Sequence, residues 1–297
     1  MSGNNGSPDG LKGIDSLKAL QSLNLSNNAF TGPFPADLFK LSTLEYLYMS
    51  NNNFNAAAFS FANNQATNLK VLSISNINIT GTFPAQPGSI IDLDISYNSI
   101  NTITSISNTL QRLNCTGNNL SALPSLTLAT SLEELYAGYN NLTTMPNIST
   151  LSKLKAFHVP NNQITGLFPD FTANPKLKSI DISGNRLRGK IPSSLETLSE
   201  LLELNIANNQ FVGPVSNWVK QRHSLRLDGN FLLQTEVAQK SVSPDVLSLI
   251  LRPGETVSLT LGSTTPGYSY VSGTVWTMSP YDTAVAAVSQ VRFNFYI

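Results

Sequence analysis

A short pattern of leucines and an asparagine recurs along most of this chain and constrains its fold more than any other feature. The pattern reads L-x-x-L-x-L-x-x-N, and successive copies start 20 to 25 residues apart. A repeat of this length is one supersecondary unit that buries its apolar side only by stacking on its neighbours. The sequence therefore predicts an elongated solenoid of about ten repeats. Nine copies start at Leu20, Leu44, Leu69, Ile90, Leu110, Leu132, Leu154, Leu177 and Leu201, and a degenerate tenth lies around Leu225.

This frame resembles the leucine-rich repeat. The longer copies also carry a Gly-x-x-Pro element at residues 32–35, 81–84, 166–169 and 189–192. That element is similar to the plant-type subclass found in receptor ectodomains and in inhibitors of wall-degrading enzymes. The shorter middle copies end in Leu123-Pro124 and Met145-Pro146 and resemble bacterial-type repeats. The resemblance implies an α/β solenoid, a leucine-rich repeat arc with one parallel strand per repeat.

Three segments follow from the extent of the frame. Residues 20–233 form the repeats. Residues 1–19 contain the P-x-x-L-x-x-I-x-x-L spacing of half a repeat, starting at Pro8, and are either an N-terminal cap or the cut edge of a longer chain. Residues 234–297 lose the frame and contain short β-rich runs separated by Pro-Gly and Ser-Pro pairs, which predicts a small all-β domain.

The all-β segment resembles the bacterial Ig-like group 2 module. The resemblance rests on residues 253–259, on Val275-Trp276-Thr277 and on residues 283–289, which read TAVAAVS. An apolar strand at the end of the chain would be an edge that needs a partner. We expect it to be an assembly strand that docks on neighbouring subunits through Phe293, Phe295, Tyr296 and Ile297.

Alternation along each repeat strand separates a buried side from an exposed one. Leu23 and Leu25 are expected to point inward, and Asn24 outward. The frame asparagine, such as Asn28, turns the chain out of the strand, and its amide can pair with backbone groups that the turn leaves open.

One copy departs from this frame. The third copy has Ile77 in place of the asparagine, so Asn76 or Asn78 is expected to substitute. Without a substitute, an unpaired buried backbone group would cost about 1–3 kcal/mol.

The composition excludes several classes of function. The 18 Lys and Arg residues balance 18 Asp and Glu residues, so nothing favours binding to nucleic acid or to an anionic membrane. No apolar run approaches the ~18 residues of a membrane span. The single cysteine, Cys115, excludes an intrachain disulfide and a cysteine-based zinc site, and its inward position predicts an inert, buried thiol. We expect no enzyme, no cofactor and no metal.

The outward side of the strands is the candidate ligand-binding face. His158 lies midway along it, with Tyr136 and Asp181 as neighbours in adjacent repeats, and the carboxylate is expected to favour a charged imidazole. Asp92, Asp94 and Glu134 were also considered as a calcium site. The predicted ligand-binding residues are Tyr46, Tyr48, Asp92, Asp94, Arg112, Glu134, Tyr136, His158, Asp181 and Glu203.

These features support three hypotheses about function. The first is a non-enzymatic recognition or adhesion module that binds a protein or glycan through its concave face. The second is a structural subunit of a virion or cell-surface assembly, docked through residues 234–297. The third is an inhibitor of a secreted hydrolase, based on the Gly-x-x-Pro element alone. All three imply an extracellular, cell-surface or virion-surface location, although the first residues, MSGNNGSPDG, do not resemble a signal peptide.

Overall fold

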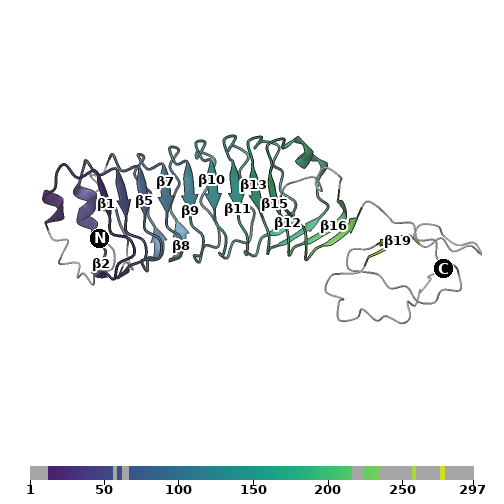
Figure 1. Ribbon diagram of the computed structural model, residues 1–297, viewed down its shortest axis with the longest axis horizontal. Coiled ribbons are helices and arrows are strands. Elements are labelled where there is room, and N and C mark those ends of the chain that lie inside the picture. The colour runs from purple at the N-terminus through teal and green to yellow at the C-terminus, as the bar shows by residue number, and fades with distance from the viewer. Residues whose placement is uncertain are drawn as a thin grey trace, which may run out of the picture.

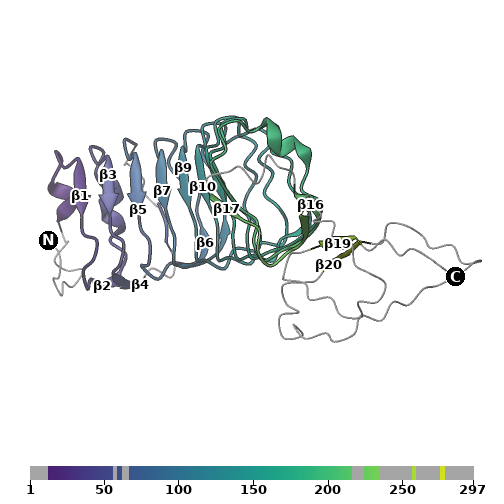
Figure 2. The same cartoon turned by 45° about the vertical axis from the view of Figure 1, so that its right-hand side comes forward.

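A computed structural model describes residues 13–55, 59–61, 67–215, 224–234, 256–258 and 275–277. One ten-stranded parallel sheet runs along the whole length of the repeats (Figures 1 and 2). Each repeat contributes one strand of three residues, and nine turns of the solenoid join the ten strands. The strands, in order, are β1 (Ser22–Asn24), β3 (Tyr46–Tyr48), β5 (Val71–Ser73), β7 (Asp92–Asp94), β9 (Arg112–Asn114), β10 (Glu134–Tyr136), β11 (Ala156–His158), β13 (Ser179–Asp181), β15 (Glu203–Asn205) and β17 (Ser224–Arg226).

A second set of short parallel strands runs along the opposite long edge of the solenoid (Figure 2). Several of these strands include the glycine of the Gly-x-x-Pro element, which takes a positive φ of 84° at Gly32 and 111° at Gly166. Among the described residues, the shorter repeats that contain β9 and β10 have no such strand. The second set consists of β2 (Thr31–Pro33), β4 (Asn53–Asn55), β6 (Thr80–Phe83), β8 (Ser99–Ile103), β12 (Thr165–Leu167), β14 (Arg186–Gly189), β16 (Gln210–Val215) and β18 (Phe231–Gln234).

The helices are short and of the 3-10 type. They are η2 (Ile14–Ser16), η3 (Ala36–Lys40) and η4 (Ser193–Thr197), and the described part of the chain contains no α-helix. The expected α/β class is therefore wrong for the described repeats, which form a β-solenoid. The physical reason is the length of the repeat. A repeat of 20 to 25 residues already supplies one or two strands, so the segment that leads back to the next strand has room for only about one helical turn.

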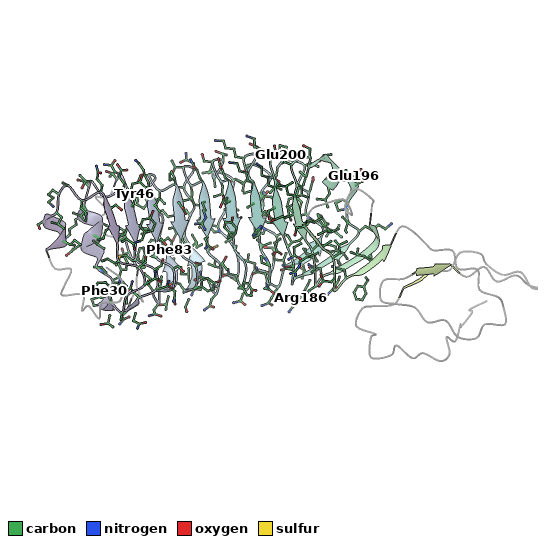
Figure 3. The ribbon with its side chains drawn as sticks, viewed as in Figure 1. Phe30, Tyr46, Phe83, Arg186, Glu196 and Glu200 are labelled. Atoms are coloured by element: carbon green, nitrogen blue, oxygen red, sulfur yellow. The ribbon has the colours of Figure 1, made fainter. Side chains whose placement is uncertain are left out.

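The core is a continuous stack of the inward frame residues. Leu47, Leu72, Leu93 and Leu113 are completely buried on neighbouring strands, and each such side chain stabilises the fold by about 1.5–3 kcal/mol. Aromatic rings fill the wider N-terminal repeats, where the Phe59 ring lies 5.1 Å from that of Phe83. Figure 3 shows Phe83 within this part of the solenoid.

The frame asparagines form a buried ladder that joins each repeat to the one before it. The Oδ1 atom of Asn140 accepts from the Leu120 backbone N–H at 3.0 Å, and its Nδ2 atom donates to the Cys115 and Ala137 carbonyls at 3.0 and 3.3 Å. This confirms the role expected from the sequence, since one amide satisfies backbone groups in two repeats. The same arrangement recurs at Asn52, Asn118, Asn162, Asn185, Asn209 and Asn230.

The ladder tolerates Ile77 because two other asparagines compensate. Asn98 in the next repeat accepts from the Ile77 and Ile79 backbone N–H groups at 3.1 and 3.0 Å. Asn78 donates to the Phe54 carbonyl at 3.2 Å, which is one side-chain bond to the preceding repeat, so Asn78 makes part of the expected substitution. Asn76 instead donates to the side chain of another asparagine on the surface.

The predicted C-terminal domain lies mostly outside the described residues. Within it, β19 (Thr256–Ser258) and β20 (Val275–Thr277) pair antiparallel. The remainder of the Ig-like resemblance and the expected assembly strand at residues 293–297 lie outside the described part of the chain. The described residues contain no helix that is both apolar and long enough to cross a bilayer.

Candidate binding surface

The outward face of the ten-stranded sheet is made of two parallel rows of side chains. The strand register aligns the residues of each row, and it places Tyr136 and Asp181 on either side of His158, as predicted. All ten residues expected to bind a ligand lie on these rows. Row 1 contains Ser22, Tyr46, Val71, Asp92, Arg112, Glu134, Ala156, Ser179, Glu203 and Ser224, and row 2 contains Asn24, Tyr48, Ser73, Asp94, Asn114, Tyr136, His158, Asp181, Asn205 and Arg226.

Arg112 organises the middle of row 1. Its Nη1 atom lies 3.0 Å from Asp92 Oδ1, and its Nε atom lies 3.4 Å from Glu134 Oε2. The guanidinium also lies 5.5 Å from the centre of the Tyr136 ring, within range of a cation–π interaction. Because Arg112 occupies the space between Asp92 and Glu134, the calcium site considered from the sequence does not form, and no metal-binding cluster occurs among the described residues.

A chain of hydrogen bonds continues from His158 toward the C-terminal repeats. The Nε2 atom of His158 lies 2.7 Å from Ser179 Oγ, and that hydroxyl donates to Glu203 Oε2 at 2.8 Å. A serine hydroxyl has a single proton, so Ser179 accepts from the imidazole. His158 is therefore protonated on Nε2, and its Nδ1 atom is an acceptor while the ring is neutral.

Asp181 favours the charged form of His158, as expected, but burial has the larger effect on its pKa. Burial lowers the pKa of His158 below its usual 6.5 and outweighs the opposing effect of Asp181 and Glu203. Asp181 bonds elsewhere: it accepts from the Ser183 backbone N–H and hydroxyl at 3.0 and 2.6 Å and from Asn205 Nδ2 at 3.0 Å. The nearest carboxylate in row 2 is thus already occupied by neutral donors.

The Tyr136 phenol and the Cys115 thiol, the two other reactive groups near this face, are both kept protonated. Burial raises the pKa of Tyr136. The carboxylate of Glu134 raises this pKa further, and it accepts a hydrogen bond from the Tyr136 hydroxyl at 3.1 Å. Cys115 lies completely buried beneath the face, as predicted, and burial raises its pKa to about 12. A thiol with that pKa is protonated at neutral pH, so Cys115 is not a nucleophile.

Sequence reasoning missed a third line of residues at the end of the face, which we call the left-handed column. Each member precedes the frame position of its repeat and has a φ between 52° and 68°. Asparagine and glycine suit this conformation, but Tyr97 and Tyr139 do not, and their side chains are 61% and 60% exposed. The sequence carried the signal as two tyrosines in a column of asparagine and glycine. The column is Asn27, Asn51, Asn76, Tyr97, Gly117, Tyr139, Asn161, Gly184, Asn208 and Gly229.

Glycines next to these tyrosines allow close packing between repeats. A Cβ atom at Gly117 would lie 2.8 Å from Tyr97 Cδ1, so the absence of a side chain lets the ring lie against the next repeat. At Gly138 a Cβ atom would lie 2.8 Å from the Pro160 ring in the same way. The glycines therefore leave room for the Tyr97 and Pro160 rings beside the neighbouring repeats.

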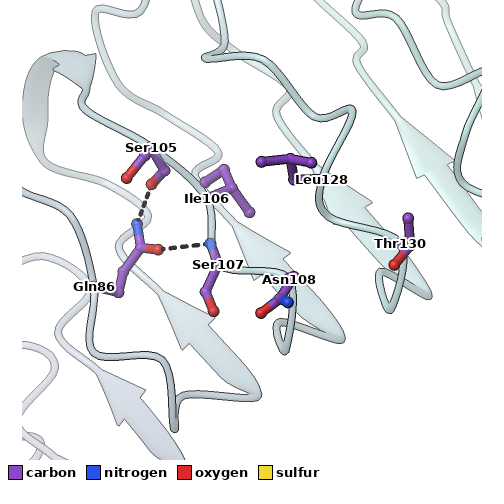
Figure 4. Close-up of a pocket in the computed structure, with 7 residues that line it drawn as sticks. All are labelled: Gln86, Ser105, Ile106, Ser107, Asn108, Leu128 and Thr130. Atoms are coloured by element: carbon purple, nitrogen blue, oxygen red, sulfur yellow. Dashed lines mark hydrogen bonds between the residues drawn. The ribbon is translucent and has the colours of Figure 1, made fainter.

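A separate hollow of about 470 Å³ lies in the loops beside this face (Figure 4). The amide of Gln86 bridges two backbone groups there, donating to the Ser105 carbonyl at 2.7 Å and accepting from the Ser107 N–H at 3.3 Å. None of the lining residues is charged or aromatic, so rows 1 and 2 offer much stronger recognition chemistry. The lining residues are Gln86, Ser105, Ile106, Ser107, Asn108, Leu128 and Thr130.

Comparison with known families identifies the repeats. The leucine rich repeat family matches residues 152–211 and again residues 19–41. The chain is therefore built of leucine-rich repeats, as the frame indicated. It is 30% identical over 210 residues to Receptor-like protein 18 of Arabidopsis thaliana, a match that covers 71% of this chain and 18% of that protein. The chain spans less than a fifth of the length of the curated relatives that it matches.

Solved structures share the same solenoid. The ectodomain of the Arabidopsis receptor kinase HAESA, in complex with a peptide hormone, is 27% identical with a TM-score of 0.58, covering 78% of this chain and 45% of HAESA. A leucine-rich repeat protein of Leptospira interrogans is 26% identical with a TM-score of 0.67, covering 79% of this chain and 61% of its own. Plant and bacterial proteins both match, as the mixture of repeat types suggested.

Proposed function

We propose that this chain is a non-enzymatic binding module that recognises a peptide or protein ligand across rows 1 and 2. The observation that carries the proposal is the face itself, a ten-stranded sheet whose outward side chains are aromatic and charged. Such a surface is rigid because each strand is fixed on both sides, except at the ends of the sheet. Tyrosines and arginines on a rigid support are the residues that contribute most to binding interfaces.

The comparisons support a peptide or protein ligand. HAESA was solved with a peptide hormone, and the related structure of PEPR1 was solved with AtPEP1. Receptor ectodomains of this kind also support a location outside the cell. A glycan ligand has no comparable support.

The two other hypotheses from the sequence remain predictions. The assembly strand that a surface or virion subunit would use lies outside the described residues. The Gly-x-x-Pro element, which suggested a hydrolase inhibitor, contributes its glycine to β2, β6, β12 and β14 of the second set of strands. That structural role accounts for the element without an inhibitory function.

Affinity capture from the native source tests the proposal. The baits are the wild type, a face variant with Tyr48→Ala, Tyr136→Ala and His158→Ala, and a control variant with three exposed changes on the second set of strands. A partner that is lost only with the face variant supports the proposal. Retention of every partner by a folded face variant would overturn it. The control changes are Asn53→Ala, Thr165→Ala and Arg188→Ala.

A fourth bait, Phe295→Asp, tests the assembly alternative. A partner that is lost only with this bait would favour docking through the C-terminal strand. Melting temperatures of all baits show whether each variant is folded.

A further inference from the structure

The binding face carries a negative charge that the whole chain lacks. The chain as a whole is neutral, with 18 basic and 18 acidic side chains. Rows 1 and 2 instead contain five carboxylates and two guanidinium groups, a surplus of three negative charges. A partner that complements this face is therefore cationic. The carboxylates are Asp92, Asp94, Glu134, Asp181 and Glu203, and the guanidinium groups are those of Arg112 and Arg226.

Three of the carboxylates are positioned but not neutralised. Asp94 accepts from the Ser96 backbone N–H at 3.0 Å and from its hydroxyl at 2.6 Å, and Asp181 is held in the same way by Ser183. Glu203 accepts from Ser179. No cation among the described residues forms an ion pair with any of the three. Neutral donors fix the orientation of a carboxylate and leave its charge available to a ligand.

The left-handed column adds two aromatic surfaces to this acidic face. Tyr97 and Tyr139 belong to repeats two strands apart, which corresponds to about 10 Å along the solenoid. A non-glycine residue in the left-handed region costs about 1–2 kcal/mol, and these exposed rings recover little of that by burial. Residues that break a local rule at a cost to stability concentrate at functional sites. Exposed tyrosine rings bind the side-chain cations of lysine and arginine.

We propose that the ligand of this face is an extended peptide segment with lysine or arginine side chains, bound by Asp94, Asp181, Glu203 and the rings of Tyr97 and Tyr139. This inference rests on the proposed function and specifies the chemistry of its ligand. From β7 to β15 there are five strand spacings, or about 24 Å. An extended peptide of about seven residues spans that distance. Successive cationic side chains on one side of the segment would then meet the rings first and the C-terminal carboxylates last.

The network around His158 suits a cationic ligand. Neutral His158 presents its Nδ1 atom as an acceptor, which can receive a hydrogen bond from an ammonium or guanidinium group. Arg112 offsets one of the two charges of Asp92 and Glu134. The carboxylates without an ion-pair partner among the described residues are Asp94 on one side and Asp181 and Glu203 on the other. One part of the face thus combines Asp94 with the exposed tyrosine rings, and the other part contains Asp181 and Glu203. Tyr136 and His158 lie between Asp94 and Asp181 along row 2.

The test is selection of ligands from a random twelve-residue peptide library displayed on phage, with the full chain as bait. The selected peptides are then measured against a face variant, Asp181→Asn with Glu203→Gln, and a control variant, Asp170→Asn with Glu196→Gln. Both variants change the net charge equally, and both keep the size of the side chains. Asp170 and Glu196 are exposed and lie away from the rows.

The expected result is enrichment of lysine and arginine, with affinity about tenfold weaker for the face variant and unchanged for the control. The same affinity should fall as salt is added. Replacing Tyr97 and Tyr139 by asparagine, which suits their backbone conformation, should also weaken binding.

Selected peptides without basic residues, or with equal affinity for the face variant, would overturn the inference. If those peptides still failed to bind the Tyr48→Ala, Tyr136→Ala, His158→Ala variant, the proposed function would stand. An absence of any selected peptide, or full binding to that triple variant, would overturn both.

Discussion

Two columns of residues lie side by side at the end of the sheet, and they differ in which residue types they accept. The frame column is buried except at Asn28 and Asn98, which are partly exposed, and it consists of asparagine in every repeat but the one that has Ile77. The left-handed column, one residue earlier, is shared by asparagine, glycine and tyrosine. In the frame column both the side chain and its surroundings are fixed, because the amide must pair with specific backbone groups. In the left-handed column every member has a positive φ, and the room for a side chain differs from one position to the next.

The difference shows where a repeat protein is free to acquire function. A position that is constrained by backbone conformation alone accepts any residue that tolerates the strain. Tyr97 and Tyr139 are the two members whose residue type does not suit that conformation. Their presence is therefore better explained by what they contact outside the chain than by what they do within it.

The largest effect is expected from breaking the frame column. Asn140→Ala removes the acceptor for the buried Leu120 N–H and a donor to the Cys115 carbonyl. Because an orphaned buried backbone group costs about 1–3 kcal/mol, we expect a loss of about 2–3 kcal/mol in the free energy of unfolding. Urea denaturation measures it. The neighbouring exposed Asn141→Ala is the control, and an equal loss in both would show that the ladder has no special role.

A smaller loss is expected from Gly117→Ala in the left-handed column. The φ of Gly117 is 68°, and the added Cβ would meet the Tyr97 ring at 2.8 Å. We expect destabilisation of about 1–2 kcal/mol from the conformational cost. Tyrosine fluorescence should also change, because the Tyr97 ring must move. A control is Gly88→Ala, where φ is not positive and no atom lies within 4 Å of the added Cβ.

The frame shows why most of the fold was predictable and the return path was not. Leu23 and its equivalents fix both the period and the inward side, so the strand register and rows 1 and 2 follow from counting residues. The segments that lead back to the next strand carry apolar residues three positions apart, as at Leu38, Leu41 and Leu44, a period that suits 3-10 turns. The α-helices expected by analogy were therefore replaced by 3-10 turns and by the second set of strands.

The candidate site was predictable in position but not in electrostatics. Tyr136, His158 and Asp181 were correctly placed as neighbours. The net shift in the pKa of His158 was not predictable, because it depends on how deeply the neighbouring repeats bury the imidazole, and burial outweighs the carboxylates. Tyr97 was missed for a similar reason, since its left-handed conformation comes from the turn after the strand and not from the apolar pattern.

A gain in stability is expected at the tyrosines of the left-handed column. Tyr139→Asn replaces a bulky residue at a φ of 53° with one that tolerates this conformation. We expect the free energy of unfolding to rise by up to about 1 kcal/mol, while ligand binding weakens. Thermal denaturation and peptide affinity measure the two effects. The control is Asn161→Gly in the same column, which should change neither the stability nor the peptide affinity strongly. A loss of stability in Tyr139→Asn would show that the Tyr139 ring stabilises the fold.

The smallest effect concerns His158, whose burial is intermediate between the two columns. Its pKa is lowered in the folded state, so the unfolded chain takes up the proton first as the pH falls. Stability attributable to the neutral imidazole is therefore complete above the unfolded pKa of about 6.5 and is lost progressively below it. We expect the wild type to lose more stability than His158→Asn between pH 7.5 and pH 5.5, as measured by urea denaturation. The opposite order would mean that Glu134, Asp181 and Glu203 together outweigh burial and that the imidazole is charged. In that case the centre of the face would be a cationic group, and a basic ligand would have to bind on either side of it.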